Sequence, residues 1–407
     1  MKILYVSYDG LTDPLGQSQV LPYLVKLRKL NYEITILSTE KKNNFLKNKS
    51  TIDLICENAG ITWEFIFYTK SPPILSTIRD VNSLKKKAKE LHKRSGFSIV
   101  HCRSYIAALI GIYSKRKFKT KFLFDMRGFW ADERVDGGIW NLNNLVFKLV
   151  YNYFKKKEKA YFLSADAAVS LTYNGKREII SWDYMKDVNY EISVIPCCAD
   201  LNYFNYQKNI ENIDVKNELG ISADDKVICY LGSTGTWYMI DEMLDYFKVH
   251  LEKYPNTTFL WITKDNPIEI LQQSKERGIG SKIVIKGGER KELPQLLSIC
   301  DASIFFIKPL YSKKASSPTK MAELLGMGIP LICNTGVGDT DEIVKKENVG
   351  LVAQEFTERS YRELVESFDN LLSIPKMQLR SVAQKYFSLE IGVKQYAEIY
   401  KKILADY

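Results

Sequence analysis

The chain alternates short apolar runs with helix-like segments in two successive series, and this repeated alternation limits the folds it can adopt. Most runs carry apolar residues on both faces, as strands of a parallel sheet do when helices cover both faces. In the first series the predicted strands are 2–8, 33–39, 61–68, 98–102, 121–126, 167–172 and 192–196. In the second they are 227–232, 257–263, 282–286, 302–307, 330–334 and 350–353.

The polar segment 202–216 separates the two series and is typical of a linker. Two β/α series favour two doubly wound α/β domains, because a single eight-stranded barrel needs fewer strands and no polar break. We expect the first domain at residues 1–200 and the second at 201–387. Ligands of such sheets bind beyond the carboxyl ends of the strands, so we also expect a central cleft between two facing domains.

The net charge of +10 is concentrated in the first half of the chain. Residues 1–200 contain 32 Lys and Arg against 20 Asp and Glu. A basic half attracts nucleic acid, an anionic membrane surface or a phosphorylated substrate, although its lysine clusters also fit solvated helix ends. No aromatic RNA-binding motif, zinc finger or recognition helix is visible, so the sequence favours a membrane surface or an anionic lipid carrier over nucleic acid.

Cysteine and histidine usage predicts neither disulfides nor a metal site. The seven cysteines are scattered, and the three histidines stand apart without zinc-ligand spacing. No apolar run approaches the roughly 18 residues that span a bilayer, and the first residues lead directly into a strand pattern. We therefore expect a cytoplasmic protein without a signal peptide.

The sharpest local pattern lies at residues 315–328 (ASSPTKMAELLGMG). Ser317 suits an N-cap and Pro318 the first helical position, which would put Lys320 in the first turn, where a cation opposes the helix dipole. This placement favours a bound anion held by Lys320 and the backbone N–H groups of Ser316, Ser317 and Thr319. A carboxylate one turn on, Glu323, suits sugar hydroxyls such as those of a ribose. The alternative is a Lys320–Glu323 ion pair on the surface of an ordinary helix.

These residues resemble a known family. Segments 316–323, 328–330 and 336–339 are similar to the donor-binding region of family 4 retaining glycosyltransferases of the GT-B fold. Further similarity lies at 194–201, 227–235, 287–290 and 300–302, so the resemblance covers nearly the whole chain. The subfamily resembled builds bacterial surface polysaccharides.

The resemblance implies a nucleoside-diphosphate sugar in the second domain, with Glu323 on its ribose and 315–320 around the diphosphate and sugar. The other donor-binding residues that it implies are Gly232, Ser233, Thr234, Gly287, Gly288 and Arg290, the last three near the base. It also implies that a C-terminal helix, 388–407, crosses back to the first domain.

The chain departs from the family pattern at two places. Ala315 stands eight residues before Glu323, where the family has a glutamate that meets the donor sugar. The loop at 232–237 also lacks the usual Arg and Lys. Lys320 is thereby predicted to be the chief cation on the diphosphate.

In the first domain, Gly16 follows the first strand and opens a helix. It fits a close backbone approach to a phosphate, or a simple β–α turn. Charged and aromatic residues then follow the fifth strand: we expect Arg127 to neutralise the leaving diphosphate, Trp130 to stack on a sugar, and Asp125 to orient the acceptor or take its proton. An internal ion-pair network is the alternative.

His101 and Arg103 end the fourth strand and are predicted to line the same acceptor site. A buried, hydrogen-bonded His101 is the alternative. The aromatic segment 139–163 reads as an amphipathic helix, which fits either a membrane surface or the core.

Together these expectations describe a metal-independent, retaining, hexosyltransferase-type enzyme that uses no cofactor. It would take its acceptor, a glycan or polyprenyl-linked molecule, at the basic first domain, at the inner face of the cell membrane. A sugar-nucleotide epimerase of the same architecture and a non-catalytic glycosyltransferase-like partner subunit remain alternatives.

Overall fold

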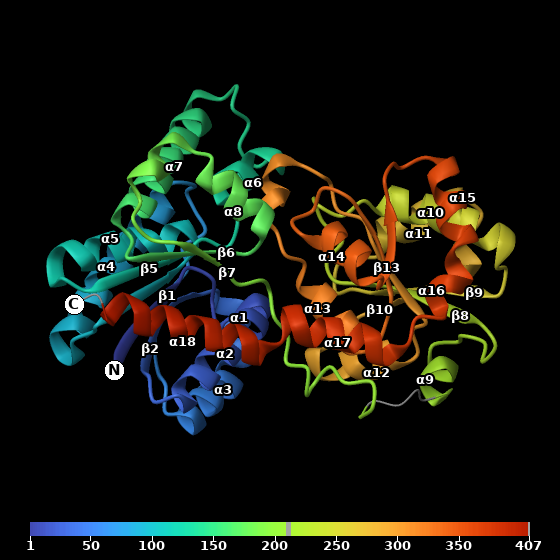
Figure 1. Ribbon diagram of the computed structural model, residues 1–407, viewed down its shortest axis with the longest axis horizontal. Coiled ribbons are helices and arrows are strands. Elements are labelled where there is room, and N and C mark those ends of the chain that lie inside the picture. Colours follow the sequence, from blue (N-terminus) through green and yellow to red (C-terminus); the bar gives the residue numbers. More distant parts are fainter. Residues whose placement is uncertain (209–212, 406–407) are drawn as a thin grey trace. The chain divides into compact units, whose positions relative to one another are not determined.

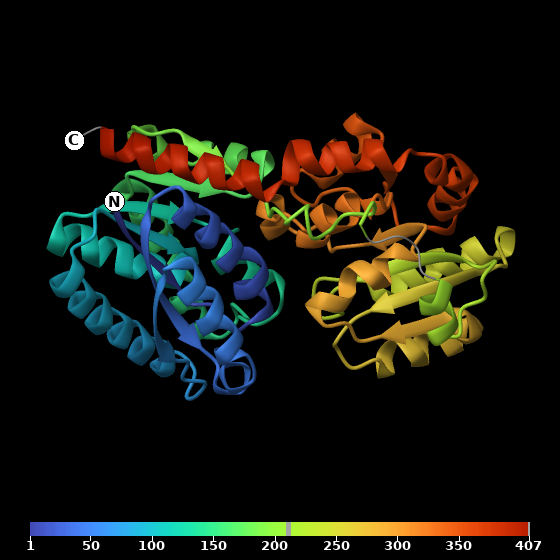
Figure 2. The ribbon, with the colours of Figure 1, turned by 90° about the horizontal axis from the view of Figure 1, so that it is seen from below.

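The computed structural model describes residues 1–208 and 213–405, which form two α/β units (Figures 1 and 2). Unit 1 contains Met1–Pro196 and the segment that begins at Leu389, and unit 2 contains Cys197–Ser388. We describe each unit by itself.

Unit 1 is built on a seven-stranded parallel sheet in the order β3-β2-β1-β4-β5-β6-β7. All seven predicted strands of this half are confirmed: β1 (Lys2–Ser7), β2 (Glu33–Glu40), β3 (Thr62–Phe67), β4 (Ile99–Arg103), β5 (Lys121–Asp125), β6 (Ala167–Ser170) and β7 (Ile192–Val194). In β1 every residue after Lys2 is buried, as the apolar run 3–6 (ILYV) requires when helices cover both faces of the sheet. The helices are α1 (Pro14–Gln19), α2 (Leu21–Lys29), α3 (Lys42–Ala59), α4 (Leu75–Ser95), α5 (Ser104–Phe118), α6 (Trp130–Asp136), α7 (Leu145–Ser164), α8 (Tyr173–Ile180) and the 3-10 helix η1 (Asp183–Asp187).

The last helix, α18 (Leu389–Ala405), belongs to unit 1 and lies along α2, which confirms the predicted crossing back (Figures 1 and 2). The Tyr32 hydroxyl donates a hydrogen bond to the Ala397 carbonyl at 3.2 Å, and the Lys26 ammonium lies 2.6 Å from the Glu390 carboxylate. A helix from one end of the chain therefore completes the unit built by the other end.

Unit 2 has a six-stranded parallel sheet in the order β10-β9-β8-β11-β12-β13. The six predicted strands are confirmed as β8 (Lys226–Leu231), β9 (Thr257–Ile262), β10 (Ile283–Lys286), β11 (Ala302–Phe305), β12 (Leu331–Asn334) and β13 (Gly350–Ala353). Its longer helices are α10 (Ile240–Lys253), α11 (Ile268–Glu276), α13 (Thr319–Gly326), α14 (Thr340–Glu347), α15 (Glu358–Glu366) and α17 (Lys376–Phe387). Its shorter helices are α9 (Ile213–Glu218), α12 (Leu293–Ser298), α16 (Phe368–Leu372) and the 3-10 helices η2 (Gly280–Lys282), η3 (Arg290–Glu292) and η4 (Tyr311–Ala315).

The division between the units differs slightly from the predicted boundaries. It falls after Pro196 rather than after residue 200, because the Ala199 amide donates to the Phe387 carbonyl and so attaches this stretch to unit 2. Of the predicted linker, α9 forms the end and residues 209–212 lie outside the described residues.

The helix predicted at 139–163 begins later, at Leu145. The side chain of Asn144 accepts hydrogen bonds from the amides of Val146 and Phe147 and so caps α7 there. Among the described residues, no helix combines the length and apolarity that crossing a bilayer requires.

Candidate functional site

The predicted anion-binding segment of unit 2 connects β11 to α13. Pro318 is the N-cap of α13 and Thr319 is its first residue, so the helix starts one residue later than expected. The reason is that Pro318 has an extended backbone, with ψ of 118°. The Ser317 hydroxyl does not cap the helix but accepts a hydrogen bond from the Cys197 amide at 3.2 Å. Among the described residues, no side chain therefore caps the first N–H groups of α13.

Lys320, in the first turn of α13, carries a buried ammonium group. The residue is 4% exposed, and Nζ has no hydrogen-bond partner among the described residues. Nζ lies 4.1 Å from the ring centroid of Tyr230 and 4.0 Å from that of Tyr238. Burial holds the pKa of Lys320 well below its ordinary value, although the charge of Glu323 opposes this shift. Burying a cation that has no hydrogen-bond acceptor among the described residues is costly, and a bound anion would offset that cost.

The loop after β8 makes room for this ammonium. Gly232 has φ of +125°, and a Cβ atom there would lie 3.1 Å from Lys320 Nζ. The next two residues are engaged within the protein. The Ser233 carbonyl accepts a hydrogen bond from the Tyr230 hydroxyl, and the Thr234 amide donates to Asp265 at 2.6 Å. Gly232 thus leaves space beside Lys320, while Ser233 and Thr234 hold the loop in place.

Glu323 pairs with Arg290 rather than with Lys320. Arg290 Nη1 lies 3.3 Å from Glu323 Oε1, and the Glu323 side chain is 10% exposed. The interpretation of Lys320 and Glu323 as a surface ion pair is therefore wrong. Burial raises the pKa of Glu323, although Arg290 and Lys320 act in the opposite direction.

The glycines before Arg290 have different roles in the structure. A Cβ on Gly288 would lie 3.1 Å from side-chain atoms of both Leu293 and Leu296, so this glycine allows the turn to pack on α12. Gly287 is exposed and its surroundings are more open. The turn then brings Arg290 to Glu323, which unites two of the predicted donor-site segments.

Residue 315, where the family resemblance expects a glutamate, is an alanine that is 1% exposed. Another lysine lies close to it in the chain: the Lys313 ammonium is 3.6 Å from the ring centroid of Trp237, and the residue is 5% exposed. Lys313 and the two tyrosines around Lys320 could not be predicted from the sequence. The rings lie far from both lysines along the chain, and only tertiary packing places them side by side.

In unit 1 the predicted acceptor residues form a buried network around Asp125. Asp125 Oδ2 accepts a hydrogen bond from the Tyr396 hydroxyl at 2.9 Å, and His101 Nε2 lies 3.5 Å from it. His101 Nδ1 is 2.7 Å from the Tyr400 hydroxyl. Burial would raise the pKa of Asp125, but Arg127 and His101 outweigh it and lower that pKa. Asp125 is 1% exposed, so the structure supports the internal network that the sequence left as an alternative.

The other residues expected at the acceptor site also have partners inside unit 1. His101 is 1% exposed and is the buried, hydrogen-bonded histidine that the sequence left as an alternative. Arg103 is 5% exposed, with Nε 3.6 Å from Asp9 Oδ2. Trp130 is half-buried, with ring centroids of Phe154 and Trp140 at 4.8 and 5.3 Å. Arg127, two residues after the end of β5, has a positive φ of 61°.

Gly16 packs against the loop that precedes it. A Cβ there would lie 2.1 Å from the Gly10 carbonyl oxygen, so close packing of the chain explains this glycine. The neighbouring amides of Leu11 and Thr12 donate hydrogen bonds to the buried Glu40 carboxylate at 2.7 and 3.1 Å. These contacts fit the β–α turn, and they leave the expected phosphate contact untested.

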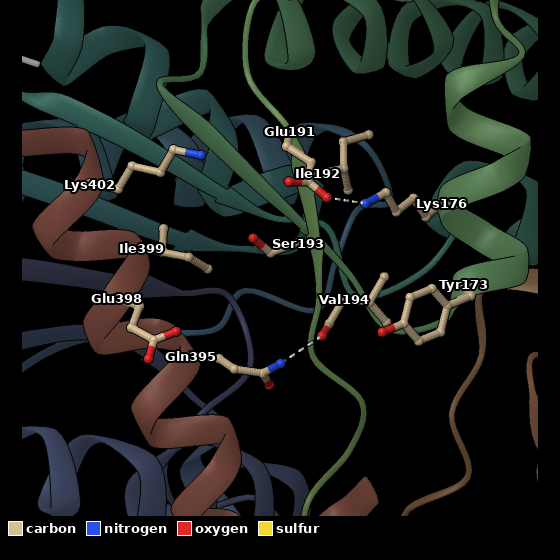
Figure 3. A pocket seen from close by; sticks show the side chains of 10 residues that line it. All are labelled: Tyr173, Lys176, Glu191, Ile192, Ser193, Val194, Gln395, Glu398, Ile399 and Lys402. Carbon is tan, nitrogen blue, oxygen red and sulfur yellow. Dashed lines mark hydrogen bonds and ion pairs between the residues drawn. The ribbon is translucent and has the colours of Figure 1, made fainter.

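A separate cavity of about 290 Å³ lies in unit 1, between β7, α8 and α18 (Figure 3). Lys176 and Glu191 form an ion pair of 2.7 Å at its wall, and the Gln395 amide donates to the Val194 carbonyl at 3.5 Å. None of the predicted catalytic, donor-binding or acceptor-binding residues lines this cavity. Among the described residues, no group of three His, Cys, Asp or Glu side chains is placed to hold a metal ion.

Part of the chain matches a known protein family. Residues 211–386 match the model of the family "Glycosyl transferases group 1". No curated protein matches the chain in sequence.

Several solved structures share the fold of both units. Sucrose-phosphate synthase from Thermosynechococcus elongatus has a TM-score of 0.73 at 14% identity, with 100% of both chains covered. A glycosyltransferase from Rickettsia africae ESF-5 has a TM-score of 0.72 at 16% identity, covering 100% of this chain and 99% of that one. Anabaena Alr3699/HepE in complex with UDP and glucose has a TM-score of 0.71 at 13% identity, covering 98% and 99%. The match to the family model shows that unit 2 carries a group 1 glycosyl transferase domain, and the likeness to the solved structures shows that the two parallel-sheet domains have the GT-B fold.

Proposed function

We propose that the protein is a retaining glycosyltransferase that moves a sugar from a nucleoside-diphosphate sugar to a glycan or lipid-linked acceptor in bacterial surface polysaccharide synthesis. The observation that carries the proposal is the buried Lys320 ammonium, which has no hydrogen-bond partner among the described residues and lies at the uncapped start of α13. The uncapped N–H groups and the ammonium both favour an anion at this point. A diphosphate would supply negative charge at this point.

Unit 2 would hold the donor. In this proposal Lys320 and the backbone of Ser316–Thr319 bind the diphosphate, and Glu323, held by Arg290, accepts hydrogen bonds from the ribose. Gly287 and Gly288 would border the base, and Gly232 the phosphates. Uracil is the first base to test, because three structures of one protein with a similar fold, Anabaena Alr3699/HepE, are described as complexes with UDP or UDP-glucose.

Unit 1 would bind the acceptor. In this proposal Arg127 neutralises the leaving diphosphate and Trp130 stacks on a sugar. His101 and Arg103 belong to the same acceptor site. Because the pKa of Asp125 is lowered, we propose that it stays ionised and orients the acceptor rather than carrying a proton. The basic charge of this half would bring the enzyme to the inner face of the membrane.

The chemistry asks mainly for stabilisation of a leaving diphosphate. The bond between the anomeric carbon and the diphosphate oxygen breaks, and the acceptor oxygen bonds to the same face of the sugar. The acceptor proton passes to the departing phosphate oxygen. Lys320 and the α13 amides stabilise the charge that develops, so we propose that the step needs neither a metal ion nor a cofactor.

A thermal-shift comparison tests the donor site. UDP, GDP, dTDP, ADP and CMP are added to wild type, Lys320→Ala, Glu323→Ala and the control Lys275→Ala, an exposed lysine on α11. At 100 times its dissociation constant a ligand stabilises by about 2.7 kcal/mol, which is readily measured. We expect one nucleotide to stabilise wild type and the control but neither site variant. If no nucleotide stabilises wild type, the donor site is refuted.

A second measurement separates transfer from the alternatives. With the donor identified, release of free nucleoside diphosphate is measured with and without acceptor. Conversion of the sugar nucleotide without acceptor would favour an epimerase, a reaction suggested by a similar fold described as a putative UDP-N-acetylglucosamine 2-epimerase from Listeria monocytogenes (TM-score 0.60, 12% identity). Nucleotide binding without any turnover would favour a non-catalytic partner subunit.

A further inference from the structure

Helix α7 of unit 1 exposes an unusually apolar face. Leu145 is 76% exposed, Leu149 70%, Val146 53% and Tyr153 46%. Leu145, Leu149 and Tyr153 follow one another at intervals of four residues, so their side chains lie along one face of the helix. Together these four residues form the α7 apolar face.

The opposite side of α7 already anchors the helix to unit 1. Phe154, Tyr161 and Phe162 are buried. Glu158 accepts a hydrogen bond from Tyr105, and Lys155 lies 3.0 Å from Asp132. The α7 apolar face is therefore not needed for the core of unit 1, and its exposure asks for a different explanation.

The exposed charge on α7 is entirely positive. The helix carries five lysines, at 148, 155, 156, 157 and 159. Its only carboxylate, Glu158, has a side chain that is 2% exposed and is paired with Lys155 at 2.6 Å. Lys148, Lys156 and Lys159 are exposed, and the Lys157 ammonium lies 5.4 Å from the ring centroid of Tyr153.

We infer that α7 docks unit 1 on an anionic lipid bilayer. The α7 apolar face enters the boundary between headgroups and acyl chains, and Lys148, Lys156 and Lys159 contact the lipid phosphates. An apolar stripe with only lysines beside it is the pattern of a helix that lies in a membrane interface, and it matches a negatively charged surface. This inference rests on the proposed function in one respect, because a lipid-linked acceptor would lie in that same bilayer.

Vesicle sedimentation tests this inference with the full chain. Vesicles of phosphatidylcholine alone are compared with vesicles that also contain phosphatidylglycerol, at low and high salt. We expect wild type to bind the anionic vesicles at least about tenfold better, and salt to weaken that binding. The double variant Leu145→Glu/Leu149→Glu should lose at least about tenfold in binding, and Lys148→Ser/Lys156→Ser should lose its preference for anionic vesicles.

The matched control is Ile268→Glu/Leu271→Glu on α11 of unit 2, where the two side chains are 65% and 49% exposed. It should bind vesicles as wild type does. Equal binding to both vesicle types, or equal losses in the control and in the α7 variant, would overturn the inference. A dimer in the absence of lipid that Leu145→Glu/Leu149→Glu converts to monomer, without change in vesicle binding, would assign the face to a second copy instead. The nucleotide thermal shift of the same variants is measured in parallel, so failure of lipid docking and failure of the donor site are read separately.

Discussion

Gly232 and Lys320 are complementary: a Cβ atom on Gly232 would lie 3.1 Å from the Lys320 ammonium nitrogen. Gly232 also has a backbone φ of +125°, which residues other than glycine rarely adopt. A glycine at position 232 therefore suits both the positive φ and the close approach of the Lys320 side chain.

Gly232→Ala should weaken both the fold and the donor site. The strained backbone should cost about 1–3 kcal/mol of unfolding free energy, and the ammonium must shift by a few tenths of an ångström. We expect the nucleotide-induced thermal shift to fall with it. The control is Gly235→Ala in the same loop, where a Cβ meets no atom within 4 Å and φ is not positive. Equal effects of the two substitutions would contradict the fit between Gly232 and Lys320.

Lys320→Met should stabilise the ligand-free protein while removing nucleotide binding. Methionine keeps much of the apolar stem but avoids burying an ammonium, so we expect a gain of about 1–3 kcal/mol in urea unfolding at neutral pH. Because the pKa of Lys320 is lowered by burial, the unfolded chain holds a proton that the folded chain loses as pH rises towards 10.5. Wild type should therefore close the gap to Lys320→Met with rising pH. A gap that widens with pH would refute the buried, unpaired ammonium.

Asp125→Ala should destabilise unit 1 strongly. It removes the acceptor of the Tyr396 hydroxyl and the negative charge that faces Arg127 inside the protein, with an expected cost of about 3–5 kcal/mol. Tyr396→Phe removes only one hydrogen bond and should cost about 1 kcal/mol. Because the pKa of Asp125 is lowered, the advantage of wild type over Asp125→Ala should hold above about pH 4 and vanish only as the pH falls through that lowered pKa. Urea unfolding over this pH range makes the comparison, and equal losses in both variants would contradict a central role for the carboxylate.

His250 should make unit 2 sensitive to mild acid. It is fully buried, 3.1 Å from the Thr257 hydroxyl, and burial lowers the pKa of His250 to about 3. Below pH 6.5 the unfolded chain takes up a proton that the folded chain refuses, so folding stability should fall by about 2 kcal/mol between pH 7 and pH 5. His250→Gln removes this titration. The pH dependence of its unfolding should be shallower than that of wild type by that amount, and identical slopes would contradict the prediction.

The thirteen strands could be predicted because their signals are local. A continuous apolar run such as 227–231 (VICYL) indicates by itself that both of its faces are covered. The start of α13 was predicted one residue early, because the extended backbone of Pro318 is not visible in a motif that suits either position. The prediction of an anion at Lys320 likewise used a local signal, since a cation in the first turn of a helix is favoured when an anion binds there.

The surroundings of these residues were decided by the tertiary structure. Tyr230 and Tyr238, which contact Lys320, lie more than eighty positions before it in the chain. Glu323 pairs with Arg290 and not with Lys320, and Tyr396 on the last helix donates a hydrogen bond to Asp125. The exposure of each apolar side chain on α7 also depends on the tertiary structure. The sequence shows apolar residues along the helix, but only packing buries Phe154 and leaves Leu149 facing solvent. The sequence by itself determined the strands, the order of the two series and the residue types of the proposed donor site, because these depend on neighbours along the chain. Pairing, burial and the resulting pKa shifts depend on residues far apart in sequence, and therefore only the folded chain determines them.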